Sequence, residues 1–397
     1  SFGDNECPQS IVLAFLDDPS APIDSSCVAD MQPLEFTLPL TSEETSNDET
    51  AAQVTEPIVI DDNAGASGLG DSLYPEMGNG GYDVKHYTLD LAVDVVNNEL
   101  DATVTIKAET IQLLSAFNLD LRGLFVERVT VDGVEVNFGR NGDELTIQPA
   151  TPLPADTLFT VVIDYNGSPQ SFRDPALSFT EIGWTEFNGG IFVFGEPSGA
   201  KTWYPSNNHP QDKATFTFNI TTDSTYTVAA TGRLVEEIEN GDETTVTWEM
   251  SSPMATYLAA IYIGDFVREE SVTDSGILIR NYFPPTLSSA EKADFAQTAD
   301  VIAYYSDLFG PYPFDVYGSI VVDGELGFAL ENQTLSIHGR DATDIYTIAH
   351  EIMHQWTGNN LSLGDWQDIW LNEGFAFYIP FLYLDATGQT DIDRLMG

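Results

Sequence analysis

His350-Glu351-Ile352-Met353-His354 is the stretch from which the fold of this 397-residue chain can be worked out. Side chains four positions apart lie on one face of a helix, with Cβ atoms about 6 Å apart, so His350 and His354 can bind one metal ion. Two histidines at this spacing, with a glutamate after the first, are typical of a zinc-binding helix. The stretch therefore predicts a helix that carries a catalytic zinc site, with Glu351 as the general base.

The third zinc ligand is predicted from a second stretch, Trp370-Leu371-Asn372-Glu373-Gly374-Phe375-Ala376. A catalytic zinc takes three protein ligands and leaves its fourth position to water, and Glu373 completes a set of two histidines and one glutamate. Eighteen residues separate His354 from Glu373, and the glycines among them favour a helix stop, a loop and a second helix. The sequence therefore predicts one Zn²⁺ held by His350, His354 and Glu373.

The alternative to a zinc site is a chance match on an ordinary amphipathic helix, because a bare five-residue match is weak evidence. The flanking sequence favours the zinc site. Acidic residues at Asp341 and Asp344 are typical of a helix start, and Gly358 is typical of a helix end. Apolar residues recur between them at helical spacing, namely Ile345, Ile348, Ala349, Ile352 and Trp356.

The chain is strongly acidic, with 63 Asp and Glu against 14 Lys and Arg and a formal net charge of −49. A negative field of this size disfavours binding to nucleic acid and to anionic membrane surfaces. No run approaches eighteen apolar positions, so we expect no membrane-spanning helix. The two cysteines, Cys7 and Cys27, predict one disulfide and a secreted or cell-surface location, with a cytoplasmic chain that holds two free thiols as the weaker alternative.

Three regions of the chain differ in their residue pattern. Residues 1–80 combine prolines with an acidic Ser/Thr-rich stretch and predict a low-complexity tail or linker. Residues 81–275 alternate apolar with polar positions and contain an Asp-Gly turn at 132–133, so they predict a domain of half-buried strands. Residues 276–397 mix helical and strand patterns and predict the domain that contains the zinc site.

Within the last region, helix boundaries can be predicted from individual residues. Ser288 and Glu291 form a capping box that predicts a helix start, and Gly310-Pro311 predicts its end. Strands are predicted at 319–322 and 334–337. Pro380 is expected to kink or end the helix that carries Glu373.

With these motifs in view, the sequence resembles the M1 family of zinc aminopeptidases, the gluzincin group that includes aminopeptidase N and leukotriene A4 hydrolase. The resemblance covers residues from about 82 to 397. It implies an α+β multidomain fold, with an N-terminal antiparallel β saddle domain followed by a thermolysin-like α/β zinc peptidase domain. Beside the two zinc stretches, it rests on Tyr82-Asp83-Val84-Lys85-His86-Tyr87, Trp203-Tyr204-Pro205-Ser206-Asn207-Asn208-His209-Pro210 and Pro253-Met254-Ala255-Thr256-Tyr257-Leu258.

The resemblance also implies the release of single residues from peptides with a free N-terminus. In the family, a Gly-Ala-Met-Glu-Asn segment forms an edge strand that pairs with the substrate backbone, and its glutamate binds the α-amine. The matching positions imply substrate contacts for Ala329, Glu331 and Asn332, whereas Phe328 stands where the family has glycine. Glu196 is the best match for a second amine anchor, with a solvated loop carboxylate as the open alternative.

One tyrosine of the family's reaction lies several dozen residues beyond the second zinc glutamate, which would be past Gly397. The resemblance therefore implies an incomplete catalytic domain, for which the C-terminal part of the same enzyme would be a partner. We expect the chain by itself to be weakly active. Tyr378 and Tyr383 lie too close to Glu373 to match this tyrosine and are interpreted as core or interface aromatics.

The residues favour metal-assisted peptide hydrolysis, but three alternatives remain. A zinc endopeptidase would use the same zinc and Glu351 and would leave Glu331 without a role. An epoxide hydrolase, as in one branch of the resembling family, would share the metal site. A cell-surface binding or scaffold module would keep the fold with low activity, although retention of every ligand and of Glu351 argues against it.

Overall fold

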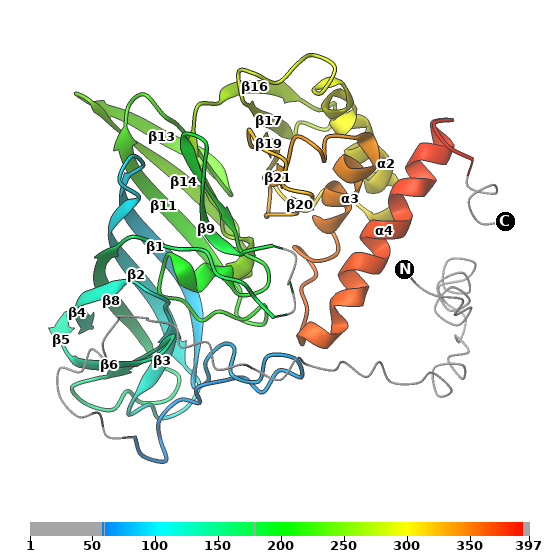
Figure 1. The fold of residues 1–397 in the computed structure, drawn as a ribbon. Helices are drawn as coiled ribbons and strands as arrows, with labels where there is room; N and C mark the ends of the chain where they lie inside the picture. Colours follow the sequence, from blue (N-terminus) through cyan, green and yellow to red (C-terminus); the bar gives the residue numbers. More distant parts are fainter. Residues whose placement is uncertain (1–57, 59, 176, 178–179, 392–397) are drawn as a thin grey trace, which may run out of the picture. The chain divides into compact units, whose positions relative to one another are not determined.

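A computed structural model describes residues 58, 60–175, 177 and 180–391, all of which belong to one compact unit (Figure 1). The predicted disulfide between Cys7 and Cys27, and most of the predicted tail, lie outside the described residues. Within the described part of the chain, no helix is both long enough and apolar enough to cross a bilayer. The described residues form a strand-rich region and a region that contains the predicted zinc helix.

The strand-rich region is built on an eight-stranded sheet with the order β13-β14-β11-β1-β2-β8-β4-β5 (Figure 1). The pairs are antiparallel except for β1 and β11, which run parallel. The strands are β1 (Tyr82–Asp94), β2 (Glu99–Thr110), β4 (Phe125–Val131), β5 (Val134–Glu135), β8 (Leu158–Gly167), β11 (Ala214–Asp223), β13 (Arg233–Asn240) and β14 (Glu243–Met254).

Two smaller sheets and two short 3₁₀ turns complete this region. The three-stranded sheet has the order β3-β7-β6, and the four-stranded sheet has the order β12-β15-β10-β9. Their bounds are β3 (Phe117–Asp120), β6 (Asn137–Asn141), β7 (Glu144–Gln148), β9 (Gly183–Phe187), β10 (Gly190–Phe194), β12 (Thr227–Ala230) and β15 (Ile261–Gly264). The 3₁₀ turns are η2 (Gly199–Thr202) and η3 (Thr256–Leu258).

The alternation that predicted strands has the expected physical origin. In β1, Tyr87, Leu89 and Leu91 are at most 2% exposed, because side chains at every second position face the same side of a sheet. The predicted Asp-Gly hairpin turn joins β4 to β5, with positive φ angles of 50° at Asp132 and 77° at Gly133. The antiparallel β-domain predicted from the sequence is confirmed.

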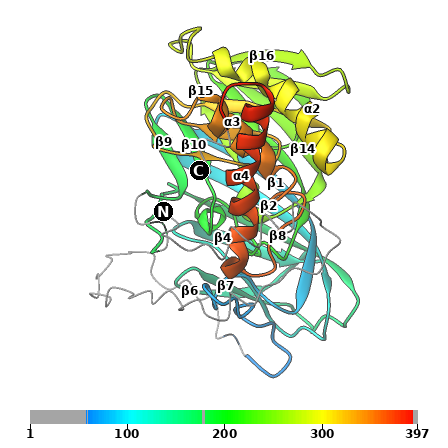
Figure 2. The same cartoon turned by 90° about the vertical axis from the view of Figure 1, so that its right-hand side faces the viewer.

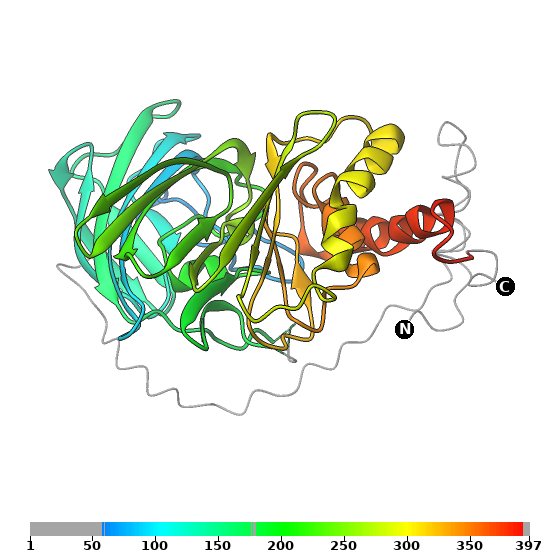
Figure 3. The same cartoon turned by 90° about the horizontal axis from the view of Figure 1, so that it is seen from above.

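The second region consists of a mixed sheet with the helices α2, α3 and α4 on one side of it (Figures 1 and 3). The strand order is β16-β17-β19-β21-β20, with β18 also paired to β17, so β20 lies at an edge. The strands are β16 (Val267–Val272), β17 (Leu278–Phe283), β18 (Val316–Tyr317), β19 (Ser319–Val321), β20 (Ala329–Leu330) and β21 (Ser336–His338). The helices are η4 (Ala293–Gln297), α2 (Thr298–Phe309), α3 (Ile345–His354), η5 (Trp366–Asp368) and α4 (Ile369–Ala386).

Two predictions about this region need correction, and one of the two outcomes expected at Pro380, a kink or a helix end, is excluded. β16 was expected in the β-domain, but it pairs with β17 and so belongs to the second sheet. The capping box forms as predicted, since the Ser288 N–H donates to Glu291 and the Glu291 N–H donates to the Ser288 hydroxyl, but the 3₁₀ turn η4 separates it from α2. Pro380 does not end its helix, because α4 continues to Ala386 with Pro380 buried inside it.

The structure also corrects the predicted tail, because residues 60–80 pack against both regions. Asp71 is only 4% exposed, and it accepts hydrogen bonds from the N–H groups of Leu73 and Tyr74. Its other oxygen accepts from the Trp366 N–H at 2.7 Å and lies 3.2 Å from Nε2 of His209. Burial raises the pKa of Asp71, but these hydrogen bonds outweigh burial and hold the pKa below its usual value. This segment is therefore a strap that is part of the core.

Asp120 is a buried carboxylate that accepts hydrogen bonds from Asn79 Nδ2 at 3.0 Å and from the Asn208 N–H at 2.9 Å. Burial raises the pKa of Asp120 to about 7, so the folded state binds more protons than the unfolded state between pH 4 and 7. Stability contributed by this group is therefore present at low pH and is lost as pH rises towards 7. Between pH 5 and pH 8, the contribution of Asp120 to the free energy of unfolding should fall by about 2 to 3 kcal/mol.

Asp120→Asn keeps the accepting oxygen and removes the titration. The difference in unfolding free energy between pH 5 and pH 8, measured with urea, should shrink in this variant by about 2 to 3 kcal/mol. Asp62→Asn, at an exposed position, should keep the wild-type difference. Equal pH dependence in Asp120→Asn and the wild type would contradict the prediction.

Candidate active site

The helix α3 presents the two predicted zinc histidines on one face. Its first turn is capped by Asp344, whose carboxylate accepts from the Thr347 N–H at 3.1 Å, as expected of an N-cap residue. On the opposite side, Ile348 and Ile352 are fully buried in a cluster that includes residues of α2 and α4. Figure 2 shows α3 and α4 next to each other. Packing of the apolar face thus fixes the direction in which the histidines point.

The three predicted ligand atoms converge on one point. Nε2 of His350 and Nε2 of His354 are 3.0 Å apart, and each lies 3.5 Å from a carboxylate oxygen of Glu373. Tetrahedral zinc with bonds of about 2.0 to 2.1 Å separates its ligand atoms by about 3.3 Å, so the observed spacing fits a zinc ion. Residues His350, His354 and Glu373 are therefore a group that can hold a metal ion.

The protonation states of His354 and Glu373 also favour metal binding. Burial lowers the pKa of His354, and its Nδ1 lies 3.2 Å from the carbonyl of Thr357. A neutral imidazole that donates from Nδ1 leaves the Nε2 lone pair free to bind a metal. Burial raises the pKa of Glu373, but His354 and His350 outweigh burial and hold this pKa below its usual range. The carboxylate therefore stays ionised.

The loop after α3 brings Glu373 to the histidines. Gly358 has a φ of +122°, which side chains other than glycine rarely adopt. A Cβ atom there would lie 3.3 Å from both His354 Nδ1 and Asn372 Nδ2, so the two helices approach closely at this position. The Glu373 side chain is 46% exposed, which leaves one side of the ligand group open.

Glu351 faces the same site from α3 and is only 4% exposed. Burial raises the pKa of Glu351 well above its usual value, and the charges of Glu331, Glu373 and Glu196 raise it further. A carboxyl group beside a metal site with a raised pKa is suited to proton transfer near neutral pH. The predicted general base therefore lies among the acidic residues of the site.

Glu331, the predicted amine anchor, directly follows the edge strand β20. Its backbone carbonyl accepts hydrogen bonds from Gln355 Nε2 at 3.1 Å and from Asn359 Nδ2 at 2.7 Å. Gln355 Oε1 in turn accepts from the Thr334 N–H at 2.9 Å. Two amide side chains, one from the C-cap of the predicted zinc helix and one from the loop after it, thus fix the segment after β20.

Glu196 is close enough to Glu331 for their charges to interact. Burial raises the pKa of Glu196 well above its usual value, and the charges of Glu331 and Glu373 raise it further. This approach depends on Gly195, because a Cβ atom there would lie 2.0 Å from the carbonyl oxygen of Tyr257. Tyr257 is buried beside Glu331. Burial raises the pKa of this tyrosine well above its usual value, and the charge of Glu331 raises it further.

The remaining predicted substrate contacts occupy different surroundings. Ala329 lies in β20 and pairs with His338 of β21. Asn332 is fully buried and donates to the Tyr262 hydroxyl at 2.6 Å, so its described contact is with the β-domain. Phe328 packs against Phe194, with ring centroids 4.5 Å apart. Substrate binding by these residues stays a prediction.

Two kinds of site residue were missed by sequence reasoning. The amides of Gln355 and Asn359 and the carbonyl of Thr357 support the site, and Tyr257 borders it. Gln355 and Asn359 could have been suspected, since they closely follow the second histidine and would otherwise be polar residues at a buried helix end. A supporting carbonyl leaves no signal in a sequence.

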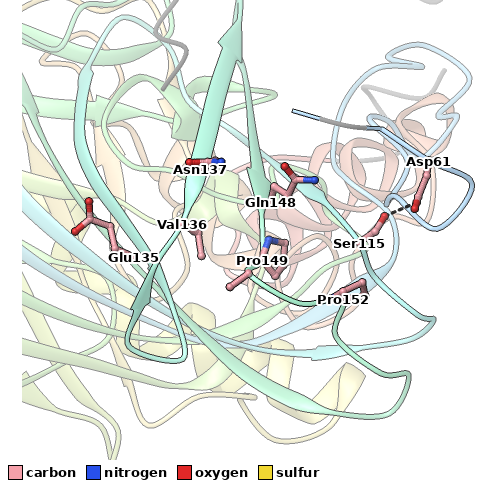
Figure 4. A pocket seen from close by; sticks show the side chains of 9 residues that line it. Asp61, Ser115, Glu135, Val136, Asn137, Gln148, Pro149 and Pro152 are labelled. Atoms are coloured by element: carbon pink, nitrogen blue, oxygen red, sulfur yellow. Dashed lines mark hydrogen bonds between the residues drawn. The ribbon is translucent and has the colours of Figure 1, made fainter. Parts of the chain in front are cut away.

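A cavity elsewhere in the molecule contains none of the site residues. It has a volume of about 400 Å³ and is lined by Asp61, Ser115, Glu135, Val136, Asn137, Gln148, Pro149, Ala150 and Pro152 (Figure 4). Asp61 and Ser115 are hydrogen-bonded to each other at its edge. The candidate active site is therefore the group around α3, not this cavity.

Comparison with known proteins agrees with the geometry. The profile of the peptidase M1 N-terminal domain matches residues 83–258, and the profile of the peptidase family M1 domain matches residues 294–396. Endoplasmic reticulum aminopeptidase 1 of Mus musculus is 26% identical over 319 residues, which cover 74% of this chain and 33% of that protein. The chain thus spans about a third of the length of this relative and of its Homo sapiens counterpart.

Solved structures show the same fold. The M1 zinc metallopeptidase from Deinococcus radiodurans superimposes with a TM-score of 0.76 at 29% identity, over 81% of this chain and 74% of that one. A mutant of that enzyme bound to the substrate Tyr-Ser-Ala gives the same TM-score and identity over 82% and 75%. Two matching profiles of one family, the shared fold and a ligand group with zinc spacing lead to one conclusion: the chain belongs to the M1 family of zinc aminopeptidases.

Proposed function

We propose that this chain is a zinc-dependent aminopeptidase that removes single residues from peptide N-termini. The observation that carries the proposal is the convergence of the His350, His354 and Glu373 ligand group with the buried carboxylates Glu351 and Glu331. The Deinococcus radiodurans relative with a bound tripeptide substrate supports the same substrate class.

The roles of the residues follow from their positions. Zinc bound by His350, His354 and Glu373 would lower the pKa of a water molecule and polarise the scissile carbonyl. Glu351 accepts the proton of the attacking water and passes it to the leaving amine. Glu331, with Glu196 near it, binds the positively charged α-amine of the substrate by a charge-assisted contact. An amine held there places the first peptide bond beside the metal ligands.

The hydroxyl groups of Tyr346 and Tyr383 bond to groups outside the zinc ligand set. Tyr346 packs beside His350, with ring centroids 6.4 Å apart, but its hydroxyl donates to the Phe377 carbonyl. Tyr383 is buried and bonds to Gln297, as its interpretation as a core aromatic requires. Among the described residues, Tyr257 is the phenol beside the anchor Glu331.

Metal binding provides the first test. After dialysis against a weak chelator, elemental analysis should find about one zinc per wild-type chain, as expected for two histidines and one glutamate. His354→Ala should lose most of this zinc, whereas His86→Asn, at a histidine of the β-domain, should keep it. A folded wild-type chain that rejects added zinc would contradict the proposal.

The general base provides the second test. Glu351→Gln should keep its zinc and should lower kcat for leucyl-p-nitroanilide by about a hundredfold or more, because general-base catalysis contributes factors of that size. The control is Glu325→Gln, an exposed carboxylate in the loop before β20. A zinc-loaded Glu351→Gln variant with wild-type kcat would rule out this role.

The amine anchor provides the third test. Glu331→Gln should lower kcat/KM about tenfold to a hundredfold for a peptide with a free N-terminus, since a hydrogen bond to a charged group contributes about 1.5 to 3 kcal/mol. The N-acetylated form of the same peptide should be a poor substrate for both proteins. Equal cleavage of free and N-acetylated peptides by the wild type would instead favour an endopeptidase.

A further inference from the structure

Two buried carboxylates lie beside the zinc ligands and are not part of that ligand set. Glu331 and Glu351 are 3% and 4% exposed, and an oxygen of each lies within 4.8 Å of the other and of a ring nitrogen of His354. Oε1 of Glu331 has no hydrogen-bond partner among the described residues. Burial of a carboxylate oxygen without a donor or a cation is costly, so this atom is suited to a positively charged ligand.

We propose that Glu331 and Glu351 bind a second divalent cation next to the zinc site, and that this ion competes with the substrate α-amine. The competition rests on the proposed function, whereas the binding of the cation does not. A neutral imidazole offers one lone pair, which His354 gives to the zinc group, so the second ion has the two carboxylates and water as ligands. Ions side by side, about 3.5 to 4 Å apart, are common in two-metal hydrolases.

The charge around the site favours a second ion. Four carboxylates converge there, those of Glu196, Glu331, Glu351 and Glu373. A second divalent ion on Glu331 and Glu351 would bring two of these carboxylates into direct contact with positive charge. Because it would occupy Glu331, this ion must be lost before an amine can contact that residue.

The chemistry of the ligands indicates which ion to use as a probe. Carboxylate and water oxygens suit Mn²⁺, and Mn²⁺ binds nitrogen and oxygen ligands more weakly than Zn²⁺, so it should not displace zinc from the histidines. Mn²⁺ can be followed by electron paramagnetic resonance, because the six-line signal of the free ion decreases when it binds. This readout does not depend on catalysis.

The experiment titrates Mn²⁺ into the full chain loaded with one equivalent of zinc. The wild type should show one Mn²⁺ site at least tenfold tighter than the weak binding to surface carboxylates, which is expected for a chain with a net charge of −49. Glu331→Gln and Glu351→Gln should each weaken that site at least tenfold. Glu325→Gln should leave it unchanged, because this exposed carboxylate lies outside the site.

A competition experiment tests the second half of the proposal. L-Leucinol carries an α-amine and no scissile bond, and it should release the tightly bound Mn²⁺, whereas N-acetyl-L-leucinol should not. Weak binding to many surface carboxylates only, or a tight site that survives both Glu331→Gln and Glu351→Gln, would overturn the second site. Tight Mn²⁺ binding that L-leucinol does not displace would support the cation site and contradict Glu331 as the amine anchor. Failure of the first zinc to bind would instead contradict the proposed function.

Discussion

The site depends on one backbone carbonyl, that of Glu331, which is held by the amides of Gln355 and Asn359. These two hydrogen bonds join the end of the metal helix to the segment after the edge strand. Each is worth only about 1 kcal/mol in net stability, but together they set the distance between the helix of the candidate zinc site and Glu331, the proposed amine anchor. In enzymes, an error of about 1 Å in such a distance can lower a rate a hundredfold, so under the proposed function we expect their main effect to be on catalysis.

The site also concentrates charge that a folded protein would normally avoid. Four carboxylates interact with one another around two histidines, and burial raises the pKa of Glu196 and Glu351 well above the usual value. Such a cluster destabilises the folded chain until cations neutralise it. Metal binding is therefore linked to folding, because ions that bind only the native site stabilise it by mass action. Under the proposed function, the same repulsion would favour binding of a cationic substrate group.

Much of the fold and of the metal group could be predicted from the sequence, because both are encoded locally. His350 and His354 share one helix face, and Glu373 follows at a distance set by a short loop. Contacts between distant segments could not be predicted. The sequence around Asp71 is typical of a loop, yet Asp71 is buried and bonded to His209 and Trp366, which lie far along the chain. The sequence left open whether Pro380 kinks or ends its helix, and α4 continues to Ala386 because its packing outweighs the local effect of one proline.

The strap around Asp71 limits the order in which parts of the molecule can fold. Asp71 and Trp366 are 295 positions apart, and domains tend to fold from the N-terminus as the chain is synthesised. The β-domain can therefore surround this carboxylate and His209 while the N–H of Trp366 has not yet been made. Until then the carboxylate lacks its closest donor, and the strap remains free to open. The loop that leads into α4 is thus the last of these partners to be synthesised, so we expect closure of the strap and completion of the metal group to occur together, late in folding.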